Sequence, residues 1–250
     1  MNFVGIDIGS TASKIIVLNE NKNKILHKKL MPSGWNSKET SEKIKEWLNS
    51  IGYTNENSKV VATGYGRISV PYANKVVTEI TCHAKGVYFL MPKDLTIIDI
   101  GGQDTKIIIS QNGKVMDFIM NDKCSAGTGK FLEIMANRLG TSLKEIFDLA
   151  KVGNEVHISS TCTVFAESEI ISLMGSGTKK EDIAKGVVTS IVRKVVSLAD
   201  RKEKSDIYFL SGGFSKSDYV LELLEKYLNA KVFTNEDGQF AGALGAALSI

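Results

Sequence analysis

The chain has 250 residues, of which 43% are hydrophobic and 3 are prolines, as expected for a globular protein with one large domain or two small ones. Its formal net charge is +3 without a long basic block, so charge gives no reason to expect a nucleic acid or an anionic membrane as a partner. Three cysteines without a short-range pair argue against a disulfide framework. The sequence shows neither a leader peptide nor an apolar run of roughly 20 residues, so we expect a cytoplasmic protein.

The first part of the chain predicts a three-stranded meander followed by a helix. Residues 3–18 contain two β-rich runs joined by a turn of small residues, and a third run lies near 24–30. Apolar residues at helical spacing then predict a helix that ends at Gly52. A strand, a glycine turn and a helix follow over residues 59–63, 64–67 and 79–90. Pro92 marks a boundary after them.

The opening strand and turn recur after this boundary. Residues 98–109 (Ile-Asp-Ile-Gly-Gly-Gln-Asp-Thr-Lys-Ile-Ile-Ile) align with residues 6–17, and Asn112-Gly113 predicts a hairpin turn into the next strand. Such a repeat indicates an α/β fold of two similar halves that face each other across a ligand-binding cleft. The expected boundaries are 1–92 for the first half and 93–238 for the second, with a closing helix near 239–250 that packs on the first half.

The remaining elements of the second half are mostly helices. Ser142 and Glu145 have the spacing of a capping box, which predicts a helix that runs to Ala150. The other predicted elements are a strand over 156–159, helices over 165–174, 183–198 and 219–228, and a strand over 207–214 that runs into a glycine turn.

The two Ile-Asp-Ile-Gly turns predict a nucleotide site. Asp7 and Asp99 each end a buried strand and offer a carboxylate to a hydrated magnesium ion, while the amides of Gly101 and Gly102 can approach a phosphate. Gln103 or Asp104 can orient the attacking water. The other candidate cofactor-binding residues are Ser10, Thr11, Ala12, Ser13 and Lys14 for the phosphates, Gly127 and Lys130 in the second glycine-rich turn, and Gly212, Gly213 and Gln239 near the nucleoside. Because the Walker spacing is absent, we do not expect a P-loop enzyme.

Two cysteines share one sequence context. Cys124 and Cys162 each precede a predicted helix, so a thiolate would lie near a helix N-terminus, where metal binding is favoured. The alternative is that both are small core residues, the usual fate of a free cysteine. Burial alone can explain Cys82. A conventional zinc site is disfavoured because the sequence has no Cys-x-x-Cys pair and its three histidines are scattered.

Several long motifs resemble one family. The paired aspartate turns and the late Gly-Gly turn look like the phosphate and adenosine motifs of the acetate kinase, sugar kinase, Hsp70 and actin superfamily, which has a duplicated actin-like (ribonuclease H-like) fold. Within it, four segments resemble the activator ATPases of 2-hydroxyacyl-CoA dehydratases, relatives of the benzoyl-CoA reductase ATPase subunits. These segments are 63–67 (Thr-Gly-Tyr-Gly-Arg), 79–86 (Glu-Ile-Thr-Cys-His-Ala-Lys-Gly), 121–130 (Asn-Asp-Lys-Cys-Ser-Ala-Gly-Thr-Gly-Lys) and 160–169 (Ser-Thr-Cys-Thr-Val-Phe-Ala-Glu-Ser-Glu).

The resemblance implies a homodimer that holds one 4Fe-4S cluster between its subunits. Cys124 and Cys162 from each subunit would supply the four thiolates. Such an activator takes an electron from reduced flavodoxin or ferredoxin, and it uses ATP and magnesium to pass the electron to the dehydratase at low potential. Two other interpretations remain open, a small-molecule kinase and a nucleotide-sensing scaffold. The client could also be benzoyl-CoA reductase or another iron-sulfur enzyme, and the sequence does not name the acyl-CoA substrate or the donor.

Overall fold

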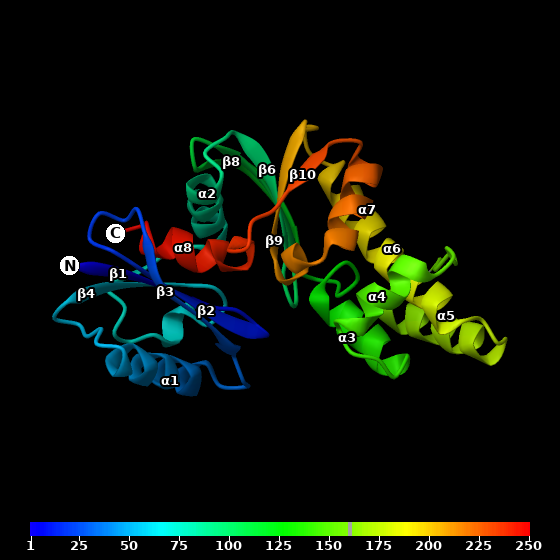
Figure 1. The fold of residues 1–250 in the computed structure, drawn as a ribbon, viewed down its shortest axis with the longest axis horizontal. Helices are drawn as coiled ribbons and strands as arrows, with labels where there is room; N and C mark the ends of the chain where they lie inside the picture. Colours follow the sequence, from blue (N-terminus) through cyan, green and yellow to red (C-terminus); the bar gives the residue numbers. More distant parts are fainter. Residues whose placement is uncertain (160–161) are drawn as a thin grey trace. The chain divides into compact units, whose positions relative to one another are not determined.

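The computed structural model describes residues 1–159 and 162–250 (Figure 1). Two five-stranded sheets organise the chain, one in the order β3-β2-β1-β4-β5 and the other in the order β8-β7-β6-β9-β10. Each strand of one sheet has its counterpart at the same place in the other, which confirms the predicted duplicated α/β fold. The strands are β1 (Asn2–Ile8), β2 (Ala12–Leu18), β3 (Ile25–Pro32), β4 (Ser58–Thr63), β5 (Lys75–Val76), β6 (Leu95–Ile100), β7 (Thr105–Gln111), β8 (Lys114–Asn121), β9 (Ile207–Gly212) and β10 (Lys231–Phe233).

The α-helices are α1 (Ser37–Ser50), α2 (Glu79–Leu90), α3 (Gly129–Arg138), α4 (Glu145–Val152), α5 (Thr163–Gly175), α6 (Lys180–Ala199), α7 (Asp218–Leu228) and α8 (Ala241–Ala247). In chain order, α1, α2, α7 and α8 follow β3, β5, β9 and β10, and the other four α-helices lie between β8 and β9. Three short 3-10 helices are η1 (Arg67–Ser69), η2 (Gly213–Lys216) and η3 (Gly238–Phe240). Among the described residues, no helix combines the length and the apolar character needed to cross a membrane.

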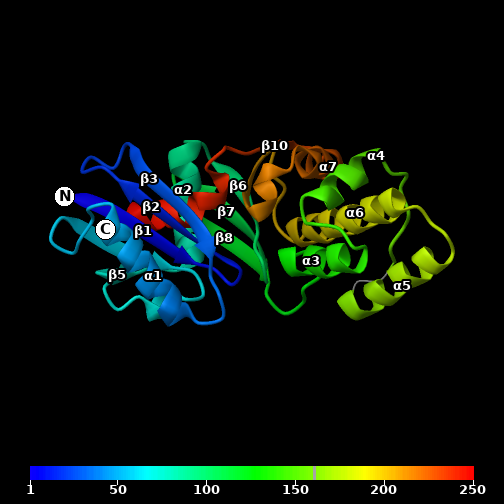
Figure 2. The ribbon, with the colours of Figure 1, turned by 60° about the horizontal axis from the view of Figure 1, so that its bottom comes forward.

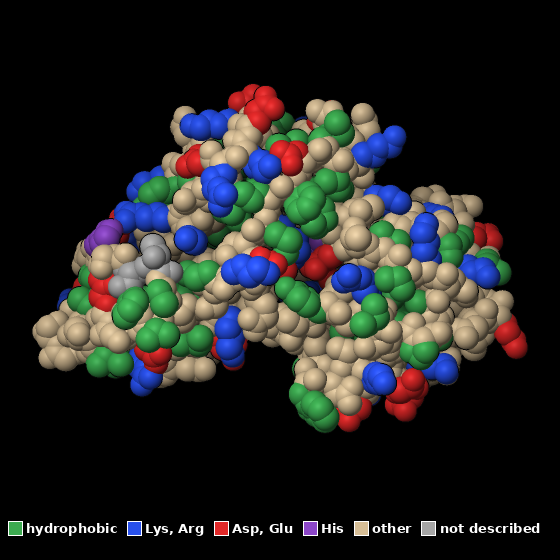
Figure 3. Space-filling view, turned by 180° about the vertical axis from the view of Figure 1, so that it is seen from behind, with side chains coloured by type: hydrophobic (Ala, Val, Ile, Leu, Met, Phe, Trp, Pro, Cys, Tyr) green, Lys and Arg blue, Asp and Glu red, His purple; other side chains and the backbone are tan. Residues whose placement is uncertain are grey.

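Contacts divide the chain into two compact units. Unit 1 contains residues 1–97, 108–117 and 235–250, and unit 2 contains residues 98–107 and 118–234. The closing helix α8 therefore belongs to unit 1. The division into two similar halves, residues 1–92 and residues 93–238, stays a prediction. On the face drawn in Figure 3, lysine and arginine side chains are interspersed with acidic and apolar ones, in keeping with the small net charge.

The strands β1, β2 and β4 of the first sheet are buried on both faces. β1 pairs antiparallel with β2 and parallel with β4. Because side chains alternate along a strand, Val4, Ile6 and Ile8 lie on one face, where they pack against Ile44 and Leu48 of α1. The opposite face is covered by α8, whose neighbour is α2 (Figure 1 and Figure 2). The residues at this interface include Ile16, Leu18, Ala243, Leu244 and Ala247.

The small residues of α8 allow the backbones to approach closely. A Cβ atom on Gly5 of β1 would lie 1.8 Å from the carbonyl oxygen of Ala243, and one on Gly245 would lie 1.7 Å from that of Cys82 in α2. Neither backbone atom can move aside as a flexible side chain could. The glycines of this interface are therefore required by packing.

We expect Gly245→Ala to lower the free energy of unfolding by about 3 kcal/mol, the upper part of the usual range for overpacking a tight core. Gly175→Ala in α5 is the matched control, because a Cβ atom there has no atom within 4 Å. The control should keep the stability or raise it by up to about 1 kcal/mol, because alanine is the better helix former. Urea denaturation of both variants measures the difference, and equal stabilities would contradict the close approach of α8 to α2.

Unit 2 is built around α6, whose 20 residues make it the longest helix of the described chain. Ile183, Val187, Ile191 and Val195 recur at helical spacing on its buried face. They belong to one core with residues of the second sheet and of α3, α4, α5 and α7. The helical spacing in the sequence therefore predicted this core element correctly.

Two local predictions have opposite outcomes. The capping box is confirmed, since the Glu145 amide donates to Ser142 Oγ at 3.2 Å and the Ser142 amide donates to the Glu145 carboxylate at 2.9 Å. These two bonds lower the pKa of Glu145, and the bond from the Ser142 amide is the largest cause.

The predicted strand over 156–159 is wrong, because this segment has no regular structure. Ile158 instead packs against α6 at Gly186, and the Ser159 amide donates to the Glu169 carboxylate at 3.1 Å.

Candidate functional site

The turn between β1 and β2 carries the first predicted set of phosphate residues. Asp7 is buried in β1, and it faces Lys14 of β2 with 3.9 Å between Oδ2 and Nζ. Ser10 and Thr11 are exposed at the turn, and Ala12 is half-buried. Ser13 is buried and shares a 2.8 Å hydrogen bond with Ser33 Oγ, so it secures the neighbouring loop.

Two glycines of unit 1 hold the Asp7 carboxylate. A Cβ atom on Gly64 would lie 2.4 Å from its Oδ1 atom, and one on Gly242 would lie 2.9 Å from its Oδ2 atom. The backbone therefore approaches the carboxylate closely from two sides, and a side chain at either glycine would collide with it. A buried, oriented carboxylate oxygen is a ligand that magnesium prefers, so the residues present fit the predicted ion.

The corresponding turn between β6 and β7 carries a buried network of three charged side chains, which we call the Asp-Lys-Asp network. Lys106 Nζ lies 2.7 Å from Oδ1 of Asp104 and 3.4 Å from Oδ2 of Asp99. All three side chains are at most 5% exposed. Ser211 Oγ donates to Asp99 Oδ1 at 2.8 Å, which joins β9 to the network. Two carboxylates and one ammonium give the network a formal charge of −1, which suits a site for a cation.

Lys106 was not among the residues predicted from the sequence. It is the counterpart of Lys14 in the repeat, so the alignment of the two turns could have identified it.

Of the two residues proposed to orient water, Gln103 is exposed, whereas Asp104 is buried and bound to Lys106. Their roles stay a prediction.

The glycine turn after β6 is connected directly to α3. The Gly101 amide closes the turn by donating to Asp104 O at 2.9 Å. The carbonyls of Gly101 and Gly102 accept from the amides of Gly129 and Lys130 at 2.9 and 2.8 Å. The first turn of α3 is therefore capped by the predicted phosphate turn, and a ligand on that turn would act on α3.

The late Gly-Gly pair has two different environments. Gly212 has φ +81°, and a Cβ atom there would lie 2.4 Å from Ile100 O, so glycine is required. Gly213 is exposed, and a Cβ atom there would have no neighbour within 4 Å. Open space beside Gly213 is compatible with its predicted place next to a nucleoside. Gln239 is half-buried in η3 of unit 1, and its role stays a prediction.

The two candidate cluster cysteines lie in one region of unit 2. Cys162 is exposed and is the N-cap residue of α5, as the sequence predicted. Cys124 is half-buried in the loop between β8 and α3. The residues that follow them, Ser125 and Thr163, share a 2.6 Å hydrogen bond between their hydroxyl oxygens, so the cysteine-bearing segments are neighbours. Residues 160 and 161, which begin one of the family segments, lie outside the described residues.

Asn121 organises the loop that carries Cys124. Its side-chain amide donates to the carbonyls of Cys124 and Ala126 at 2.8 and 3.0 Å, and its Oδ1 atom accepts from the Cys124 amide at 3.3 Å. Cys82 differs from both candidates, because it is fully buried in α2 and burial raises the pKa of its thiol to about 12. One chain thus presents two accessible thiols, half of the four that a 4Fe-4S cluster usually needs.

The first comparison with known proteins concerns the sequence. Residues 4–249 match the model of the BadF/BadG/BcrA/BcrD ATPase family. The (R)-2-hydroxyglutaryl-CoA dehydratase activating ATPase of Acidaminococcus fermentans is 44% identical over 98% of this chain and 95% of its own length.

Solved structures agree with the sequence match. The crystal structure of component A of the Acidaminococcus fermentans (R)-2-hydroxyglutaryl-CoA dehydratase has a TM-score of 0.93 and 42% identity, and the match covers 99% of this chain and 96% of that one. The activator of the 2-hydroxyisocaproyl-CoA dehydratase from Clostridium difficile, solved with bound ADPNP, has a TM-score of 0.92 and 41% identity over 99% and 93% of the two chains. A ROK family glucokinase from Streptomyces griseus, at 16% identity and a TM-score of 0.66, shares the fold alone, which confirms the predicted fold class.

Proposed function

Because the chain belongs to the BadF/BadG/BcrA/BcrD ATPase family, we propose that it hydrolyses ATP to activate a 2-hydroxyacyl-CoA dehydratase. The observation that carries the proposal is the near full-length likeness to two dehydratase activators, one of which was solved with bound ADPNP. In this function the Asp7 and Asp99 carboxylates hold magnesium. The turns that follow them, with Lys14, bind the phosphates.

The activating event in this proposal is the transfer of one electron. A 4Fe-4S cluster would supply a one-electron carrier of low potential. Cys124 and Cys162 would hold it together with the same two cysteines of a second copy of the chain, since four thiolates are needed. The electron would come from reduced flavodoxin or ferredoxin, and we expect the protein to be cytoplasmic. A client of the benzoyl-CoA reductase type is the alternative, supported by 30% identity to one component of that enzyme from Thauera aromatica over 76% of this chain.

The surface of α5 supports the proposed homodimer. Next to Cys162, the side chains of Val164 and Phe165 are 66% and 68% exposed, and those of Ile171 and Met174 further along the helix are also exposed. Apolar side chains gathered on one helix of a globular protein indicate an interaction surface. A second copy seated here would cover them and bring its own Cys162 to the shared site.

We expect Asp99→Asn to lower magnesium-dependent ATP hydrolysis at least about 100-fold, the usual cost of losing an electrostatic group at a transition state. The fold should remain, because Lys106 keeps its nearer partner Asp104, whose Oδ1 atom lies 2.7 Å from its Nζ atom. Asp200→Asn is the control, since Asp200 is exposed at the end of α6. Phosphate release by the reduced dimer, with and without its dehydratase, measures the effect. Equal rates for the three proteins, or no hydrolysis by any of them, would contradict the proposed ATPase.

We expect the state of the nucleotide to change the surroundings of the cluster. The structural reason is that the Gly101 and Gly102 carbonyls cap α3, and the loop that precedes α3 carries Cys124. The EPR signal of the reduced protein should therefore differ between ADP, a hydrolysis-resistant ATP analogue and no nucleotide. Identical signals in the three samples, together with dehydratase activation that proceeds without ATP, would leave a plain electron carrier.

A further inference from the structure

A pocket of about 140 Å³ that is partly open to solvent lies in unit 2 between α6 and the loop that carries Cys124. Thr105 of β7 and Asn121, Ala126 and Gly127 of the loop line one side. The other side is formed by the end of α6 and the turn after it, with Lys194, Ser197 and Arg201. Gly127 is also a candidate residue of the nucleotide site, whereas the α6 residues and Arg201 are not.

The cavity lies on the other face of the second sheet from the Asp-Lys-Asp network. Thr105 and Lys106 are consecutive in β7, so their side chains point to opposite faces. Ile107, which shares the face of Thr105, belongs to the core that contains α6. A ligand beside Thr105 is therefore separated from Lys106 by the sheet itself.

The charged residues that line the cavity are both cations. Lys194 and Arg201 contribute to it, and the described lining residues include no aspartate or glutamate. Lys194 is half-buried and Arg201 is exposed, so an anion in this pocket would be attracted by both cations while it keeps part of its hydration. A polar cavity of this size holds water or an ion, and a lysine and a guanidinium are the usual partners of phosphate.

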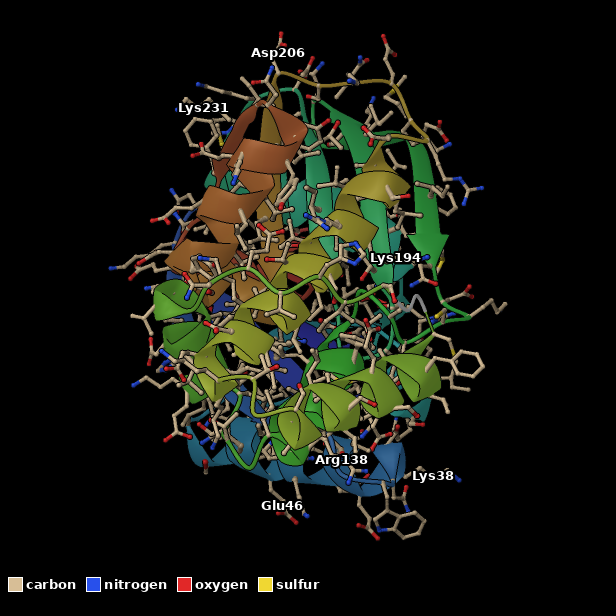
Figure 4. The ribbon with its side chains drawn as sticks, turned by 90° about the vertical axis from the view of Figure 1, so that its right-hand side faces the viewer. Lys38, Glu46, Arg138, Lys194, Asp206 and Lys231 are labelled. Atoms are coloured by element: carbon tan, nitrogen blue, oxygen red, sulfur yellow. The ribbon has the colours of Figure 1, made fainter. Side chains whose placement is uncertain are left out.

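The site is held in place from both sides. The stem of Lys194 packs against Gly127, because a Cβ atom on that glycine would lie 2.9 Å from Lys194 Cγ. Gly127 has φ +86°, and its carbonyl accepts from Thr105 Oγ1 at 2.6 Å. Figure 4 shows Lys194 on α6. The Cβ and Cγ atoms of Lys194 are therefore packed against the loop that carries Cys124.

The volume limits the size of the ligand. Sites for nucleotides and other drug-sized ligands measure about 300–1,000 Å³. A nucleotide or a coenzyme A molecule is therefore too large, whereas one tetrahedral oxyanion with a few waters fits.

We propose that this cavity binds one inorganic phosphate ion between Lys194 and Arg201, and that the bound ion stabilises the loop that carries Cys124. The connection to the loop is direct, because Asn121 lines the cavity and donates to the carbonyls of Cys124 and Ala126. Phosphate is also a product of ATP hydrolysis, so the site would let product accumulation act on the cysteine loop.

The test is a calorimetric titration of the purified protein with inorganic phosphate at constant ionic strength. A hydrolysis-resistant ATP analogue at saturation fills the nucleotide site throughout. The wild type should bind phosphate, and Lys194→Gln and Arg201→Gln should each weaken binding at least tenfold. Lys204→Gln, an exposed lysine outside the cavity, removes the same charge and should bind as the wild type does. Phenyl phosphate should bind more weakly than phosphate, and equal or tighter binding would overturn the size assignment.

Hydrogen exchange tests the effect on the loop without relying on the cluster or on ATPase activity. Phosphate should slow exchange of the amides of residues 121–128 in the wild type and leave them unchanged in Lys194→Gln. Absence of phosphate binding by the wild type, or equal binding by Lys194→Gln and the wild type, overturns the site. If the wild type binds phosphate but the exchange of these amides does not change, the proposed stabilisation of the loop is wrong.

Discussion

Replacing Cys124 or Cys162 with serine should remove nearly all bound iron from protein purified without oxygen, whereas Cys82→Ser should retain it. A cluster shared by two copies loses two of its four thiolates with each of the first two substitutions. A serine hydroxyl is mostly protonated at neutral pH and is a much weaker iron ligand than a thiolate. Anaerobic iron and sulfide analysis, with visible absorbance as a second readout, measures the loss.

The expected difference between the cysteines comes from their surroundings. Cys162 is exposed at the N-cap of α5, and Cys124 is half-buried in the neighbouring loop. Cys82 is fully buried, and its raised pKa of about 12 keeps the thiol protonated, so it is a poor metal ligand. Thermal unfolding of each variant controls for misfolding. Equal iron content in the three folded variants would leave Cys124 and Cys162 without a role in holding a cluster.

The alignment of the two turns predicted the buried strand that carries each of the two aspartates. Asp7 and Asp99 are buried at matching places in matching strands, and the sheets repeat one strand order. The alignment succeeded because a duplicated segment forms the same local structure twice. Helical spacing likewise identified α6, since apolar residues every three or four positions can be buried together only on one face of a helix.

The contacts that the sequence did not predict join segments far apart in the chain. Ser211 donates to Asp99, a pairing that depends on β9 lying beside β6 in the sheet. The segment 156–159 has the composition of a strand but contacts α6 and Glu169 instead. A β-rich segment becomes a strand only where a neighbouring strand completes its hydrogen bonds, and composition does not show that neighbour.

Lys106 also illustrates the limit of sequence patterns. A lysine in a strand is usually exposed, so nothing in its residue type indicates full burial. Burial is tolerated because two carboxylates surround the ammonium group. Lys14 at the matching position is 20% exposed and lies 3.9 Å from Asp7. The same repeat therefore contains one buried lysine with two carboxylate partners and one partly exposed lysine beside a more distant carboxylate.

This difference predicts unequal effects on stability. Lys106→Met should lower the free energy of unfolding by roughly 3–5 kcal/mol, because it leaves two buried carboxylates close together without their shared cation. That is a large part of the roughly 5–15 kcal/mol typical of a native protein. Lys14→Met should cost no more than about 1 kcal/mol, the range for a partly exposed ion pair. Urea denaturation of the two variants, both without nucleotide, compares matched positions of one repeat.

A second substitution separates charge from packing. If the cost arises from unpaired carboxylates, Asp104→Leu added to Lys106→Met should recover stability, since it removes the carboxylate whose Oδ1 atom lies 2.7 Å from Lys106. The loss in free energy of unfolding of the double variant should therefore be smaller than the sum of the losses of the two single variants. We expect the difference to be at least about 1 kcal/mol, within the range measured for residues in one network. Additive effects, or equal costs for Lys106→Met and Lys14→Met, would show that the buried lysine acts mainly by filling space. In that case the Asp-Lys-Asp network would not be the electrostatic centre of the second turn.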